Sequence, residues 1–134
     1  PKPSVEEKVE PTRPAHEIAF ERLTKLEGDQ LWQVGKTKEF YSELTDILRE
    51  YIELRFHIPA LEQTTDEIIQ SMRRSPNFSV ELIEKTNQVL FLADLVKFAK
   101  EKPIGSENEQ NMLLVRNFID ETKRTEQQPT KTNG

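Results

Sequence analysis

Along the middle of the chain, apolar residues recur at steps of three and four, which is the period of an amphipathic helix. The clearest case is a predicted helix that begins at Thr37 and runs toward His57. Pro59 closes it, because the residue before a proline avoids helical backbone angles. Its inner face is expected to consist of Phe40, Leu44, Ile47, Leu48, Tyr51 and Ile52.

A shorter helix is predicted before this one. It opens near Pro14, a residue suited to a first helical turn, and Gly28 ends it. Asp29 then caps a short helical turn that carries Trp32, and Gly35 stops that turn. The segment between the two glycines is therefore expected to connect the two long helices.

Two capping boxes mark the starts of further helices. In this motif a serine or threonine and a glutamate three residues later each satisfy the other's free backbone N–H. Thr64 with Glu67 opens a helix that ends before Pro76, and Ser106 with Glu109 opens the last one.

The helix that lies between these two is expected to hold the centre of the core. Ser79 caps it, and Phe78 and Ile83 have the spacing of a hydrophobic staple. Its residues 89–99 are apolar on nearly every side, which is typical of a buried helix. We therefore expect this segment to be the most buried part of the chain, with a core formed by Leu90, Phe91, Leu95 and Phe98.

These signals predict an all-α protein, a small helical bundle of about five helices plus one short helical turn. The helical domain is expected over residues 14–124. Residues 1–13 carry three prolines and many charges and are predicted to form a linker, and residues 125–134 are predicted to be a disordered tail. Because the first residue is proline, we expect the chain to be a piece of a longer protein.

The composition argues against several functional classes. A net charge of −5 disfavours nucleic-acid binding, and the lack of cysteine excludes thiolate chemistry. The two histidines, His16 and His57, have no glutamate three residues before them, the spacing of bundle metal sites. Ser79 and Ser106 are explained as helix caps, and no glycine-rich phosphate loop is present. We expect no catalytic residues, no metal and no cofactor.

Two features have both a structural and a functional interpretation. Trp32, the single tryptophan, is either a core anchor or a residue of a binding interface, where tryptophan is enriched. Basic residues at two predicted helix ends either complement helix dipoles or form a surface for an anionic partner, if the ends meet in space. The candidate partner-binding residues are therefore Arg73, Arg74, Lys97, Lys100, Lys102 and Trp32.

Three blocks of sequence carry a resemblance to a known family. They are residues 31–56, with LWQ, FY, LTDILREYIE and RF; residues 58–68, with IPALE and TTDEI; and residues 93–100, with ADLVKFAK. In this order they resemble a cytoplasmic helical domain of unknown function in membrane proteins of Bacteroides and its relatives. In that family the domain follows a transmembrane helix and a proline-rich linker. The genes belong to the aerotolerance (Bat) neighbourhood, beside a MoxR-type AAA+ ATPase and von Willebrand A proteins.

The resemblance implies a non-enzymatic protein-interaction (adaptor) domain on the cytoplasmic side of a bacterial inner membrane. It implies a membrane tether upstream of this piece, and the MoxR-type ATPase or a von Willebrand A protein as the partner. It transfers no catalytic residue to this chain. The alternative is a small helical regulatory domain that binds a ligand or nucleic acid.

Overall fold

The fold is a bundle of helices without strands over the part of the chain that the structure, a computed structural model, describes, residues 13–127. This confirms the predicted fold class. All but the last residue of the predicted linker, residues 1–13, lies outside the described residues, and so do residues 128–134 of the predicted tail, residues 125–134. The five helices are α2 (Ala15–Asp29), α3 (Thr37–Phe56), α4 (Thr65–Arg73), α5 (Val80–Ala99) and α6 (Gly105–Gln127), with 3₁₀ turns η1 (Trp32–Val34) and η2 (Ala60–Glu62).

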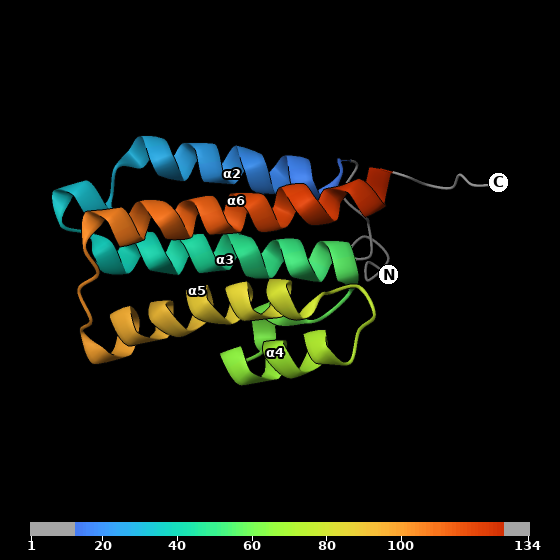
Figure 1. The fold of residues 1–134 in the computed structure, drawn as a ribbon. Coiled ribbons are helices and arrows are strands. Elements are labelled where there is room, and N and C mark those ends of the chain that lie inside the picture. The colour runs from blue at the N-terminus through green and yellow to red at the C-terminus, as the bar shows by residue number, and fades with distance from the viewer. Residues whose placement is uncertain (1–12, 128–134) are drawn as a thin grey trace, which may run out of the picture.

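Helix α3 lies at the centre of the bundle and packs against α2, α5 and α6 (Figure 1). The short helix α4 packs on α5, on the side of the molecule away from α2. The predicted inner face of α3 is confirmed, since all six of its residues are 2% exposed or less. The core is therefore built around α3, with contributions from every neighbouring helix.

The caps show which local signals were correct. The Thr64–Glu67 capping box is confirmed, and the Ser79 hydroxyl accepts a hydrogen bond from the N–H of Leu82 at 3.1 Å. The predicted Ser106–Glu109 box is wrong. Helix α6 starts earlier, at Gly105, and the Glu107 carboxylate accepts from the N–H of Ile104 at 3.1 Å.

Three predicted boundaries differ from the structure. Helix α2 continues through Gly28, because one glycine costs a helix only about 1 kcal/mol, and it ends at Asp29, after which Gln30 adopts the left-handed conformation. Asp29 does not cap the following turn but pairs with Lys25 at 3.2 Å. Helix α6 extends to Gln127 and so includes three residues that we assigned to the tail.

The expectation that residues 89–99 are the most buried segment is wrong. Leu90 is buried, but Leu95 is only half-buried, and Phe91 and Phe98 are 57% and 80% exposed. The physical reason is coverage: α3, α4 and α6 pack around α5 but leave its outer face open. A helix that is apolar on every side needs more neighbours than this bundle supplies.

Candidate interaction surfaces

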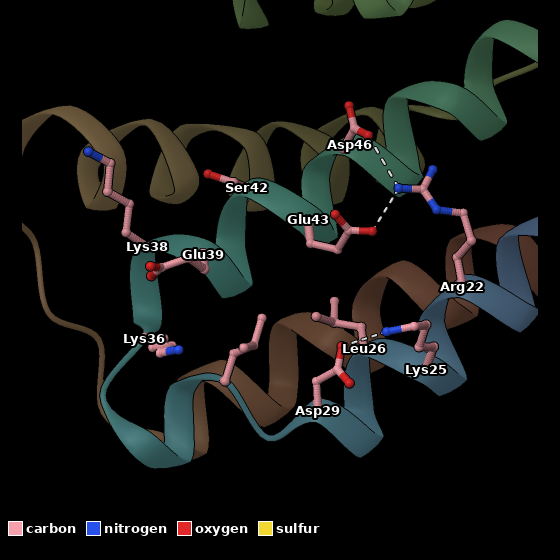
Figure 2. A pocket seen from close by; sticks show the side chains of 11 residues that line it. Arg22, Lys25, Leu26, Asp29, Lys36, Lys38, Glu39, Ser42, Glu43 and Asp46 are labelled. Carbon is pink, nitrogen blue, oxygen red and sulfur yellow. Dashed lines mark hydrogen bonds and ion pairs between the residues drawn. The ribbon is translucent and has the colours of Figure 1, made fainter.

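A groove of about 940 Å³ lies between the second half of α2 and the first half of α3 (Figure 2). Four cationic side chains line it, and so do four carboxylates, so their charges cancel. Leu26 and Leu31 contribute apolar surface. A groove with balanced charges and little apolar lining does not select a particular small molecule.

Arg22 of α2 binds three carboxylates of α3 at the edge of this groove. The guanidinium lies 2.6 Å from Glu50, 2.7 Å from Glu43 and 3.3 Å from Asp46. These carboxylates recur at three and four residues and therefore share one face of α3. Partial burial opposes the charge on Arg22, but the three hydrogen bonds outweigh it and raise the pKa of the guanidinium. Arg22 therefore fastens α2 to α3.

The structure places Trp32 half-buried in η1, where it packs on the first residue of α6. A Cβ atom at Gly105 would lie 3.0 Å from the indole ring, so glycine permits this close approach. Trp32 also lines a small hollow of about 270 Å³ with Phe40 and Met112. Trp32 thus joins η1 to α6 while part of its ring stays exposed. This arrangement fits the interpretation of Trp32 as an anchor more closely than its interpretation as a residue of a binding interface.

The five basic candidates do not form one patch. Helices α4 and α5 are antiparallel, as the hydrogen bond from Thr65 at the start of α4 to Asp94 late in α5 shows, at 2.7 Å. Arg73 and Arg74, at the other end of α4, therefore lie beside the beginning of α5. The other three candidates lie at the opposite end of α5: Lys97 is in its last turn, and Lys100 and Lys102 follow that turn.

The three lysines differ among themselves. Lys100 and Lys102 are exposed, whereas Lys97 is half-buried. Burial lowers the pKa of Lys97, as does the nearby Arg49, while Asp94 and Asp46 oppose that effect. Lys97 therefore belongs to the packed side of α5, and only the other two present their charges fully to solvent.

An apolar surface on α5 is the feature that sequence reasoning missed. We call Phe91, Leu95 and Phe98 the α5 strip; they lie four and three residues apart, on one face of the helix. Among the described residues, seven large hydrophobic side chains are exposed. Five of these belong to α5, to α6 or to their connection: Val80, Phe91, Phe98, Ile104 and Leu113.

A narrow groove of about 270 Å³ runs beside this strip, between α5 and α6. Its α5 wall consists of Gln88, Phe91, Leu92 and Leu95, and its α6 wall includes Glu107 and Gln110. Asn111 at its base is buried and donates a hydrogen bond to the Tyr41 hydroxyl at 3.1 Å. The α5 wall is thus apolar except for Gln88, whereas the α6 wall is polar.

Within residues 13–127, no group of three or more histidine or acidic side chains is arranged to hold a metal ion, and no helix is long and apolar enough to cross a bilayer. No protein-family model, curated protein or solved structure matches the chain. The class that the structure defines is an all-helical bundle with an uncovered apolar helix face.

Proposed function

We propose that the chain is a non-enzymatic protein-interaction domain that uses the α5 strip to bind another protein. The observation that carries this proposal is the exposure of Phe91 and Phe98 in the second half of α5, which is apolar on nearly every side. A single exposed apolar residue is ordinary, but exposed apolar side chains in a continuous row are typical of interaction sites. Aromatic side chains are also enriched at the centres of such interfaces.

The sequence resemblance supplies the setting of the proposal. It points to a membrane-anchored protein whose helical domain lies on the cytoplasmic side, and to the MoxR-type ATPase or a von Willebrand A protein as partner. Under this proposal the domain is an adaptor within that assembly and needs no catalytic group of its own.

A ligand-binding or nucleic-acid-binding regulator is the weaker alternative. Small-molecule sites are mostly apolar with a few polar groups, whereas the large α2–α3 groove is lined mainly by charged side chains. Nucleic-acid binding needs concentrated positive charge, and the basic helix ends of this chain are separated. Both observations favour a protein partner.

The test is capture of the two candidate partners, taken from one genome, by the purified domain, with and without nucleotide. Phe98→Glu is expected to reduce capture by at least about thirtyfold, as for a binding hot spot. Val34→Glu, a change of similar exposure on η1, serves as the matched control and is expected to leave capture unchanged. The doubly reversed variant Arg73→Glu/Lys97→Glu tests the basic helix ends.

Capture of neither protein at low salt would remove these candidate partners. Capture that is equal for the wild type and Phe98→Glu would exclude the α5 strip as the binding surface. Capture lost only in the doubly reversed variant would move the interface to the basic helix ends.

A further inference from the structure

The α5 strip belongs to a longer stripe with the spacing of a coiled-coil seam. Glu84, Gln88, Phe91, Leu95 and Phe98 follow one another at steps of four, three, four and three residues. Such steps keep side chains on one side of a helix and form the seam along which two helices pack. Glu84, Gln88 and the two phenylalanines are exposed and Leu95 is half-buried, so most of this seam is open.

The α5 wall of the small groove has the arrangement that accepts a side chain from a second helix. In coiled coils, each knob enters a hole made by four residues of the facing helix. Gln88, Phe91, Leu92 and Leu95 occupy positions i, i+3, i+4 and i+7 and line a hollow of about 270 Å³. An apolar knob of aromatic size suits this hole, and Phe98 is the most exposed aromatic side chain on the same helix.

The charges along the stripe show which helix fits it. Glu81 and Glu84 lie at the beginning of α5. Lys100 and Lys102 follow its end, on either side of Glu101, and all five side chains are exposed, so this end keeps a net positive charge. Lys85 pairs with Glu81 within the same turn, which leaves the Glu84 side of the helix acidic. If the helix is reversed and laid against itself, its acidic beginning meets its basic end. The stripe is therefore complementary to a second, antiparallel copy of itself. An isologous, two-fold interface requires this kind of self-complementary surface.

We propose that two copies of this chain associate through α5, antiparallel, with Phe98 of each copy inserted into the Gln88–Leu95 hole of the other. The inference rests on the proposed function, because it takes the α5 strip to be an interaction surface, and it names a second copy as the occupant when no other partner is bound. Glu84 of one copy then lies near Lys102 of the other, and the two pairs fix the antiparallel orientation. Oppositely charged residues flanking an apolar seam set orientation in this way in coiled coils.

The test is sedimentation equilibrium of the whole chain over a range of concentrations. The wild type is expected to show a monomer–dimer equilibrium that Phe98→Glu weakens by at least about thirtyfold. The matched control, Val34→Glu, is expected to retain the wild-type equilibrium. Circular dichroism of each variant checks that the helices remain folded. We expect both variants to fold, because the side chains of Val34 and Phe98 are exposed.

A charge exchange tests the orientation separately. Glu84→Lys and Lys102→Glu are each expected to weaken the dimer by up to about fivefold, the range of an exposed ion pair. The double variant Glu84→Lys/Lys102→Glu is expected to recover the wild-type affinity, because it restores opposite charges across the interface. Single losses without recovery in the double variant would overturn the antiparallel arrangement.

The remaining outcomes separate this inference from the proposed function. A chain that stays monomeric but captures a candidate partner through Phe98 would overturn the second copy as occupant and leave the proposed function standing. A monomer that captures neither candidate would overturn both. A dimer that Phe98→Glu does not weaken would place self-association on another surface and overturn the inference.

Discussion

Helices α3 and α5 have the same length, 20 residues, but the bundle uses them in opposite ways. Helix α3 alternates apolar and polar faces, and its apolar face is fully buried while its outer carboxylates bind Arg22. The second half of helix α5, residues 89–99, is apolar on nearly every side, and only its inner face is covered. In this bundle, the central position is therefore held by α3, whose apolar residues all lie on the side that its neighbours cover, and not by the more hydrophobic α5.

The largest expected effect compares one leucine from each helix. Leu44 of α3 is fully buried, so Leu44→Ala is expected to lower the free energy of unfolding by about 2–5 kcal/mol. Leu95→Ala on α5 is expected to cost about 1–2 kcal/mol, because that side chain is half-buried and loses less contact. Chemical denaturation measures both values. A larger loss for Leu95 would place the core on α5 after all.

A smaller effect tests the polar face of α3. Arg22→Met is expected to destabilise the fold by about 1–2 kcal/mol, since it leaves three carboxylates together after removing their shared cation. Lys25→Met, which removes only an exposed pair with Asp29, is the control and should cost less than about 0.5 kcal/mol. Equal losses in the two variants would show that the Arg22 cluster adds nothing.

The stabilisation from Arg22 has a defined pH dependence. Its pKa is raised in the fold, so the contribution is fully present below the ordinary arginine pKa and is lost only as the pH rises through the folded-state value. The difference between the wild type and Arg22→Met should therefore stay constant through neutral pH, as far as the arginine's own titration is concerned.

The smallest effect on stability is expected on the α5 strip. Phe98→Ala should change the free energy of unfolding by less than about 0.5 kcal/mol, because the ring is mostly exposed. The measurement belongs at low protein concentration, where self-association adds no stability. A loss comparable to that of Leu44→Ala would mean that the ring packs within the monomer and that the outer face of α5 is not open.

Local signals allowed much of the fold to be predicted. The period of α3, the Thr64 capping box and the Ser79 cap all depend on residues within a few positions of one another. The exposed face of α5 had no such signal, because a helix that is apolar all round carries no direction in its sequence. The uncovered side is decided by how α4 and α6 pack.

Contacts between distant residues were also beyond sequence reasoning. Tyr41 donates a hydrogen bond to Asn108, 67 residues away, and accepts one from Asn111, and this buried cluster connects α3 to α6. The separation of Arg73 from Lys97 likewise follows from the antiparallel pairing of α4 with α5. Neither the cluster nor the separation can be deduced without the packing order of the helices.

The start of α2 and the end of α6 lie at the same end of the bundle, where Lys123 approaches the ring of Phe20 at 5.7 Å (Figure 1). Tension applied between these two points would pull two adjacent helix ends apart, one turn at a time, rather than slide the helices past one another. Separating contacts in sequence requires less force than breaking them together. Force applied between these two points would therefore open the contact between α2 and α6 from that end.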